Sequence, residues 1–307
     1  VDAAIVTLLA NGPAARRITA MDLTERRRMT SAIPALFDAA GDSEPQIRIA
    51  AARKLGELAG PAELPRLLDL LARAASPEDL EATEQALSAV SLKATDPASC
   101  VAQIEASLGQ ASPPRKCALV RVLGAVGGPN ALKAVRAAAN DPNVQVHAAA
   151  IRVLGGWSTV DAAPDLLELA KTAVNATDKM ICLRGYLRLA GQADLPVNQR
   201  LVLCRQAAAL AQKDDEKKLL LAALGGIPSI EALDLVAQYL GEAGTKEAAI
   251  TAVVNVADKL LKDKDAAKCA PRLAEVLDKA AGATASADLG KRAKDLCDQA
   301  KGKAGEK

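Results

Sequence analysis

Residues 141–157, DPNVQVHAAAIRVLGGW, open with an acid–proline pair, continue as a run of small apolar residues and close on Leu-Gly-Gly. Residues 44–60, EPQIRIAAARKLGELAG, repeat this order closely. A segment that recurs within one chain indicates a repeat architecture. The two copies therefore predict a fold built from stacked units of similar structure.

The glycine or small residue that closes each copy recurs along most of the chain. It is found at seven positions: Gly56, Ser91, Gly124, Gly155, Gly191, Gly225 and Ala257. Successive positions are 31 to 36 residues apart. A period of this length is typical of a helical solenoid, in which each unit contacts only its neighbours.

Both copies carry one apolar stripe with the spacing of a helix face. The stripe consists of Ile47, Ala51, Leu55 and Leu58 in the first copy and of Val144, Ala148, Ile151 and Leu154 in the second. Pro45 and Pro142 stand at the expected first helical position, where a missing N–H costs nothing. The preceding acids, Glu44 and Asp141, are placed to cap that helix end. We expect the closing glycine to take the left-handed conformation that stops a helix.

The composition favours helices throughout. Half of the residues are hydrophobic, but Ala and Leu supply most of them, and the chain has one Phe, one Trp and two Tyr. Strand-favouring residues are sparse beside the strong helix formers. A net charge of +2 provides no global field for nucleic acid or acidic membranes. No apolar run reaches the roughly 18–20 residues that a membrane span needs. The chain begins with Val, and we expect it to be a processed protein or a piece of a longer one.

The sequence resembles HEAT repeats in the short form common in bacteria. The resemblance rests on DPNVQVHAAAIRVLGG and SEPQIRIAAARKLGELAG, with weaker copies PPRKCALVRVLGAVGG and DDEKKLLLAALGGIPS, and covers about residues 22–281. The family often has Arg in the position of Arg48, where the second copy has Gln145, so the repeats have drifted. The resemblance implies a superhelical binding scaffold, usually without catalysis. Such arrays also occur attached to catalytic or haem domains of large bacterial envelope proteins.

We therefore expect an all-α superhelix, a solenoid of about seven to eight HEAT-like helix pairs, over residues 1–301. Capping helices should occupy residues 1–41 (near 2–11 and 22–40) and 286–301, repeats should occupy 42–281, and 302–307 should be a disordered tail. The expected first helices are 45–58, 77–91, 115–125, 142–155, 178–190, 214–225 and 246–258. Their expected partners are 61–74, 98–108, 129–139, 160–174, 197–212, 229–241 and 264–281.

Residues that could support catalysis or hold a metal are few. His147 is the only histidine, so no second imidazole can join it in a zinc site or act as a second base. The chain has no phosphate-binding, dinucleotide-binding, nucleophile-elbow or haem-attachment motif. We predict no catalytic residue, no metal and no cofactor. Two arginine clusters, residues 16–17 and 26–28, could contact phosphate or an acidic partner; an exposed face of an end helix is the preferred interpretation.

The six cysteines are Cys100, Cys117, Cys182, Cys204, Cys269 and Cys297. Taken in order as pairs, their midpoints are 108.5, 193 and 283, close to the expected turns near 111, 194 and 283. Residues equidistant from the turn of a helical hairpin lie opposite each other, so three disulfides, 100–117, 182–204 and 269–297, are our hypothesis. They would place the protein in an oxidising compartment, periplasmic or secreted. The alternative is six buried thiols in a cytoplasmic protein.

We expect the chain to bind another protein, or another domain of its parent chain, through the side chains of its second helices. The candidates are Arg66, Asp69, Lys133, Arg136, Asp165, Glu168, Glu231, Asp234 and Gln238. Packing in the core or between repeats is the preferred interpretation of Trp157; if an aromatic residue anchors a partner, Trp157 is the candidate. Their mixed charges fit a protein better than a nucleic acid. A groove-type enzyme or ligand-binding protein acting on tetrapyrroles or nucleic-acid bases is one alternative, which would require a pocket lined by Trp157 or His147. A purely structural spacer is the other.

Overall fold

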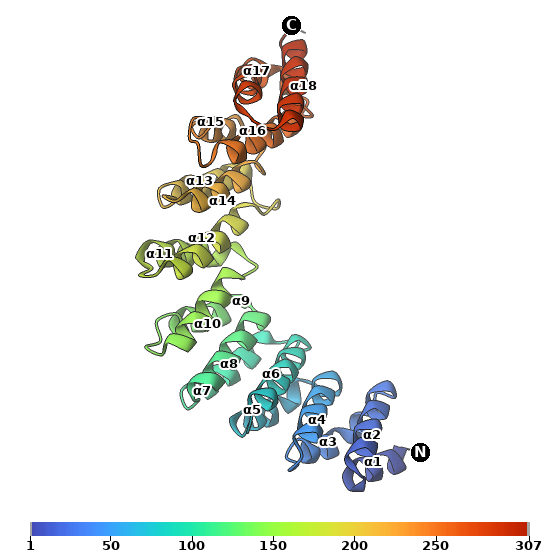
Figure 1. Cartoon of the computed structure of the whole chain (residues 1–307). Coiled ribbons are helices and arrows are strands. Elements are labelled where there is room, and N and C mark those ends of the chain that lie inside the picture. Colours follow the sequence, from blue (N-terminus) through green and yellow to red (C-terminus); the bar gives the residue numbers. More distant parts are fainter. Residues whose placement is uncertain (1, 306–307) are drawn as a thin grey trace. The chain divides into compact units, whose positions relative to one another are not determined.

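The computed structural model describes residues 2–305 (Figure 1). Over this range the chain forms eighteen α-helices and three short 3-10 helices and no β-strand, and 77% of it is helical. The all-α prediction is confirmed. Contacts between residues divide the chain into two compact units, residues 1–157 and 158–307. The prediction that residues 1–301 act as one array stays a prediction.

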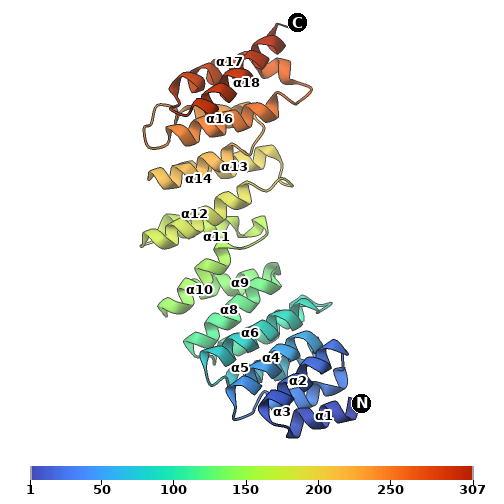
Figure 2. The ribbon, with the colours of Figure 1, turned by 45° about the vertical axis from the view of Figure 1, so that its right-hand side comes forward.

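In the first unit two sets of helices alternate along the chain (Figure 2). The first helices are α2 (Ala14–Arg26), α4 (Pro45–Leu58), α6 (Pro77–Leu92), α8 (Pro113–Val126) and α10 (Val144–Gly155). The second helices are α1 (Asp2–Asn11), α3 (Ile33–Ala39), α5 (Leu64–Ala72), α7 (Pro97–Leu108) and α9 (Gly128–Ala138). Each first helix packs on the next first helix, and α1, α3, α5, α7 and α9 form a second layer against them.

The second unit repeats this arrangement. Its first helices are α12 (Ala176–Ala190), α14 (Asp214–Leu224), α16 (Lys246–Leu260) and α18 (Ala287–Ala304). Its second helices are α11 (Ala163–Thr172), α13 (Val197–Ala208), α15 (Ile230–Ala237) and α17 (Ala266–Ala283). The 3-10 helices η1 (Thr30–Ala32), η2 (Pro61–Glu63) and η3 (Val160–Ala162) each lead into a second helix. All seven first helices expected between residues 45 and 258 are present, with ends within two residues of the prediction.

The predicted single helix near 22–40 is wrong. Helix α2 ends at Arg26, where Arg28 takes a left-handed backbone (φ 51°). The N–H groups of Arg28 and Met29 donate to the carbonyls of Glu25 and Thr24 at 2.8 and 2.9 Å, the pattern of a Schellman turn. The chain then starts again at α3 with Pro34 in its first turn, a position where proline is tolerated. The segment therefore forms the end of one helix and a whole second helix.

The register predicted for residues 142–155 is also wrong, by about two residues. Helix α10 begins at Val144 because the Asn143 side chain accepts the N–H groups of Gln145 and Val146. Val144 is 78% exposed and Val146 is buried. The position corresponding to Arg48, fourth in its helix, is consequently taken by His147 and not by Gln145.

Glycines near the ends of the first helices serve close packing and do not stop the helix in a left-handed turn. Gly127 and Gly128 have positive φ, whereas Gly56, Gly124 and Gly225 take ordinary backbone conformations. A Cβ on Gly56 would lie 3.0 Å from the Ala86 Cα of the next first helix, and one on Gly124 would lie 2.4 Å from Val153 Cγ1. At Gly56, Gly124 and Gly225 the missing side chain therefore permits the close approach of the next first helix.

Ion pairs link the starts of successive first helices. The pairs are Arg17–Asp42 (2.7 Å), Arg48–Asp79 (2.9 Å), Lys116–Asp141 (3.2 Å), Lys179–Glu216 (3.0 Å) and Lys217–Glu242 (2.6 Å). Glu216 is buried, which acts to raise its pKa, but the N–H groups of Lys213 and Gln212 and the Lys179 ammonium outweigh burial and hold that pKa below its usual value. These acids also lie at or near helix N-termini, where negative charge is favourable.

Lysine side chains cap the C-terminal ends of first helices in the preceding repeat. Lys93 Nζ donates to the carbonyls of Gly56, Glu57 and Ala59 at 2.7–3.1 Å. Lys259 Nζ donates in the same way to Gly225 and Gly226 at 3.3 and 2.9 Å. These carbonyls have no partner within their own helix, so each cap satisfies polar groups of the preceding repeat.

The same device explains why the tail prediction is wrong for residues 302–304, which belong to α18. Lys303 Nζ donates to the Leu261 carbonyl at 2.9 Å and ties the last turn of α18 to the end of α16. Residue 305 follows the helix, and residues 306–307 of the predicted tail lie outside the described residues.

All six cysteines are free thiols in the structure, so the predicted bridges 100–117, 182–204 and 269–297 are not formed. The register of the hairpins is the reason. Cys117 packs against Val146 and Ala149 of the next first helix. Cys297 Sγ lies 3.4 Å from the Ala274 carbonyl, which is five residues, about 7.5 Å of helix, from Cys269.

The hairpin of α12 and α13 has a similar offset. The Tyr186 hydroxyl donates to Gln206 at 2.6 Å, so Cys204 lies opposite a position about six residues from Cys182. Burial raises the pKa of both thiols to about 12. With no disulfide in the structure, the argument for an oxidising compartment loses its basis, and periplasmic or secreted location stays a prediction.

We expect Gly124→Ala to lower the free energy of unfolding by about 1 kcal/mol, because the clash with Val153 outweighs the gain in helix propensity. Gly282→Ala is the matched control, since a Cβ at this helical position meets nothing within 4 Å; this change should stabilise the protein. Urea unfolding followed by circular dichroism measures both. In a Val153→Ala background the cost of Gly124→Ala should disappear, and a cost that persists there would contradict the close-packing explanation.

We expect Glu216→Gln to cost about 2 kcal/mol at neutral pH, because Lys179 loses its counter-ion. The pKa of Glu216 is lowered in the folded state, so its contribution is complete above the ordinary value of 4.5 and is lost as the pH falls through the depressed value. Urea midpoints of wild type and variant should therefore differ at pH 7 and converge as the pH falls below the lowered pKa of Glu216. Asp215→Asn, on an 82% exposed side chain, is the control with little effect; an equal loss at both pH values would refute the linkage.

We expect iodoacetamide to label six thiols of the denatured protein without prior reduction, as counted by intact mass. In the native protein at pH 8, labelling should be confined to Cys269, because it is the partly exposed cysteine and the other five thiols are buried away from the reagent. Cys269→Ser should abolish native labelling. A requirement for reductant in denaturant would restore the disulfide hypothesis.

Candidate functional site

The larger of the two pockets described lies in the first unit, between the second helices α3 and α5, and has a volume of about 530 Å3. The first helices α4 and α6 contribute to its lining. Its charged lining residues are Asp38, Asp42, Arg48, Arg66, Asp69, Arg73 and Asp79, and its other lining residues are Phe37, Ala40, Gly41, Ala52, Leu70, Ala74, Ala75 and Thr83. A pocket of this size can hold a small molecule or a side chain of a partner.

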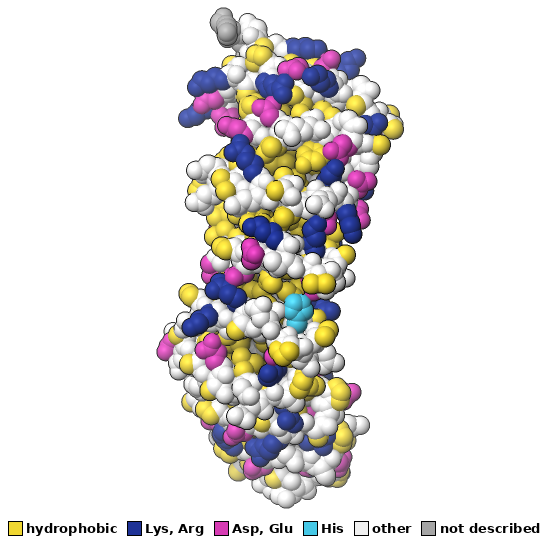
Figure 3. Space-filling model, turned by 90° about the vertical axis from the view of Figure 1, so that its left-hand side faces the viewer, with side chains coloured by type: hydrophobic (Ala, Val, Ile, Leu, Met, Phe, Trp, Pro, Cys, Tyr) yellow, Lys and Arg dark blue, Asp and Glu magenta, His cyan; other side chains and the backbone are white. Residues whose placement is uncertain are grey.

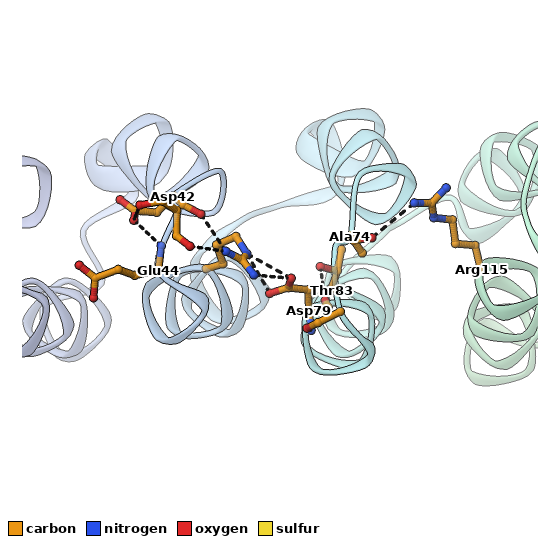
Figure 4. A network of polar contacts seen from close by, with 9 residues as sticks. Asp42, Glu44, Ala74, Asp79, Thr83 and Arg115 are labelled. Atoms are coloured by element: carbon orange, nitrogen blue, oxygen red, sulfur yellow. Dashed lines mark hydrogen bonds and ion pairs between the residues drawn. The ribbon is translucent and has the colours of Figure 1, made fainter.

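An ion pair neutralises the charges contributed by α4 and α6 (Figure 4). Arg48 Nε and Nη2 donate to the Asp79 carboxylate at 3.1 and 2.9 Å, and its Nη1 donates to the carbonyls of Asp42 and Ser43 at 3.0 and 2.9 Å. The Asp79 carboxylate raises the pKa of Arg48. The Thr83 hydroxyl donates to the Asp79 carbonyl at 2.8 Å. This arrangement leaves Arg48 few donors for a ligand.

Asp42 is likewise committed within the protein. Its carboxylate accepts the Glu44 N–H at 2.9 Å and forms the 2.7 Å pair with Arg17. The Glu44 N–H and, after it, the Arg17 guanidinium hold the pKa of Asp42 below its ordinary value. Asp42 therefore belongs to the inter-repeat link and presents little charge to the pocket.

The rim of the pocket carries the side chains with remaining capacity. The Arg66 guanidinium lies 3.8 Å from the centre of the Phe37 ring and forms a 3.2 Å pair with Glu63. Arg73 Nε donates to the backbone carbonyl of Asp69 at 3.2 Å. Asp38 and Asp69 are exposed, and neither has an ion-pair partner among residues 2–305.

The lining has no thiol, no imidazole and one hydroxyl. It contains no Cys and no His, and its hydroxyl, from Thr83, is buried and donates to a backbone carbonyl. Across the described part of the chain, no three His, Cys, Asp or Glu side chains form a group that could hold a metal ion. The enzymatic interpretation predicts a pocket lined by Trp157 or His147. Neither residue lines either of the two described pockets.

The predicted partner residues of the first unit are Arg66 on α5 and Lys133 and Arg136 on α9. All three are exposed, and Arg66 lines the pocket. Asp69, a further predicted partner residue, lines the same pocket. Trp157 is 4% exposed, so the indole lies in the core, which is the preferred interpretation of this residue, and it is not presented as a surface anchor.

The predicted residues of the second unit are spread over α11 and α15. Asp165 is half-buried and Glu168 pairs with Lys171 at 3.6 Å. Asp234 pairs with Arg272 at 2.8 Å, Glu231 accepts the Ser229 hydroxyl, and Gln238 is exposed after α15. These residues are therefore engaged largely within the repeats.

Sequence reasoning missed Phe37, Asp38 and Arg73. The first two lie on α3, which was hidden inside the predicted helix 22–40. Pro34 was the signal that could have separated α3 from α2. Arg73 follows Arg66 by seven residues, the spacing of one helix face.

The arginine clusters near the N-terminus are partly engaged. Arg17 pairs with Asp42 at 2.7 Å and Arg27 pairs with Asp2 at 2.8 Å, while Arg16, Arg26 and Arg28 are exposed. On the face shown in Figure 3, Lys and Arg side chains alternate with Asp and Glu. Among residues 2–305, no helix has both the length and the apolar character that crossing a membrane requires.

Comparison with solved structures identifies other helical-repeat proteins. Kap121p bound to Pho4p is 12% identical, with 98% of this chain and 39% of that chain covered and a TM-score of 0.52. An archaeal HEAT-like repeats protein from Thermococcus onnurineus NA1 is 13% identical over 99% of this chain and 98% of that chain, with a TM-score of 0.30. The CpcE and CpcF complex of phycocyanin lyase from Nostoc sp. PCC7120 is 17% identical over 84% and 94%, with a TM-score of 0.39.

No curated protein matches the chain. A family model of HEAT repeats matches residues 3–88 and 102–184, which together make up more than half of the sequence. The chain belongs to the HEAT-repeat family.

Proposed function

We propose that the protein is a non-catalytic interaction scaffold whose second-helix layer binds another protein, or another domain of its parent chain. HEAT-repeat proteins commonly bind proteins. The observation that carries the proposal is the pocket between the second helices α3 and α5, whose rim has charged groups of both signs. Such a rim complements the mixed charges of a protein surface, and a polyanion would require one sign.

The distribution of ion pairs in the first unit also supports the second-helix layer as the binding surface. First helices direct many charged side chains toward one another, as in Arg48–Asp79 and Arg121–Glu84. On the second helices, Asp38, Asp69 and Glu105 have no ion-pair partner within residues 2–305. Unpaired charges on an exposed face lose little on contact with a partner of complementary charge, because no internal pair must be broken.

The enzymatic alternative and the spacer alternative differ from the scaffold in what they require. An enzyme needs convergent groups of perturbed pKa around a pocket, and the two rim aspartates are exposed and unpaired. A spacer needs no partner for its second helices. The spacer alternative leaves a pocket with a charged rim unexplained.

We expect a photo-crosslinking amino acid introduced as Asp69→benzoylphenylalanine or Lys133→benzoylphenylalanine to give covalent adducts with one distinct protein in cells of the source organism. Arg53→benzoylphenylalanine and Glu81→benzoylphenylalanine, on exposed positions of the first helices α4 and α6, are the matched controls. Gel mobility and mass spectrometry of the adducts provide the measurement. Adducts from all four positions would contradict a layer-specific surface, and no adducts would favour the spacer.

A further inference from the structure

The second helix α5 presents an alternating charge pattern to the pocket. Arg66, Asp69 and Arg73 all line it, and their spacing of i, i+3 and i+7 places them on one helix face. The two arginines are about 10 Å apart along the axis, with the aspartate between them. A complementary ligand therefore has positive charge at its centre and negative charge on either side.

Two exposed carboxylates of the lining come from different helices. Asp38 lies on α3 beside Phe37, and Phe37 contacts Arg66 of α5 through its ring. Asp69 lies one turn after Arg66 on α5. The Phe37–Arg66 contact thus holds together the two helices that carry the uncommitted acids, while the other two acids of the pocket are engaged by Arg48 and Arg17.

The chemistry of the pocket disfavours two other ligand classes. A bound metal ion needs several converging ligands, and no such group of three is found in the described part of the chain. An anion would depend on Arg66 and Arg73, and Asp69 stands between these two arginines in the sequence of the helix. An organic cation meets neither obstacle.

We propose that this pocket binds a basic side chain, Arg or Lys, of a partner protein, placed between Asp38 and Asp69 and flanked on the partner by acidic residues that face Arg66 and Arg73. The proposal rests on the proposed scaffold function and names the chemistry of its partner. The aliphatic stem of the basic residue packs on Leu70, Ala74 and neighbouring alanines of the lining. Its charged group replaces water at the two carboxylates.

The first test uses butylguanidinium, which mimics an arginine side chain, and butyrate as the control of opposite charge. The full chain is labelled at its alanine methyl groups and titrated with each compound by NMR. Butylguanidinium should shift the methyl signals of Ala40, Ala52 and Ala74 in a saturable manner. Shifts caused by butyrate and not by butylguanidinium, or no saturable shift at all, would overturn the proposal.

The second test assigns the binding to the two carboxylates. Asp38→Asn and Asp69→Asn should each weaken butylguanidinium binding by about fivefold to tenfold. Glu105→Gln, an exposed acid of α7 outside the pocket, is the matched control and should bind as the wild type does. Both aspartates are exposed, so we expect both variants to fold, and thermal unfolding verifies this. Unchanged affinity in both pocket variants would refute the assignment.

The third test separates a protein side chain from a free small cation. A blocked alanine-rich helical peptide carrying Glu, Arg and Glu at i, i+4 and i+7 should bind more tightly than butylguanidinium. The same peptide with Gln in place of both Glu residues should lose this advantage and bind about as tightly as butylguanidinium. A peptide that binds no more tightly than butylguanidinium would contradict the proposal that the ligand is a side chain of a protein.

The outcomes are distinct from those of the crosslinking experiment. If the crosslinks form and butylguanidinium does not bind, the scaffold stands and the basic-residue pocket falls. If butylguanidinium binds and the crosslinks do not form, the pocket recognises cations but the scaffold role falls.

Discussion

The close approach of successive first helices is the constraint on which the rest of the structure depends. At Gly56 and Gly124 the next helix passes so near that a Cβ would lie 3.0 Å from Ala86 Cα or 2.4 Å from Val153 Cγ1. Helices packed at this distance bring the ends of neighbouring repeats within reach of a single side chain. The ion pairs at one end and the lysine caps at the other both follow from it, because each needs a short span between repeats.

The links in turn determine which groups remain available for function. Arg48 is committed to Asp79, and Lys93 donates to three carbonyls of the preceding repeat. Polar groups so engaged stabilise the stack and offer little to a ligand. Asp38 of α3 and Asp69 of α5 have no ion-pair partner among residues 2–305, and both line the larger pocket. The charged groups of the first helices therefore mainly bind one another, whereas charged groups of the second helices remain available to a partner.

Much of the fold could be predicted from the sequence, because acid–proline starts, apolar stripes and a regular period are local signals. Positions whose meaning depends on neighbouring repeats were misread: the closing glycines are packing contacts, and the cysteine pairs are out of register although their midpoints match the turns. The chain breaks between α2 and α3 at Arg28, which has φ 51°. Arginine does not usually take this left-handed conformation, so the residue type gives no signal of the break. The pocket could not be predicted, since Phe37 and Arg66 come from helices whose contact is visible only in three dimensions.

The placement of the links has an elastic consequence. In the first unit every step between first helices is fastened by at least one side chain, from Arg17–Asp42 to Lys116–Asp141. The second helices are joined mainly by apolar packing and by the Arg66–Phe37 contact. A stack fastened along one edge and looser along the other deforms by fanning, so strain applied to it is taken up as spreading of α3 from α5. We expect the space between α3 and α5 to be a compliant part of the unit, and a partner group bound there would stiffen it locally.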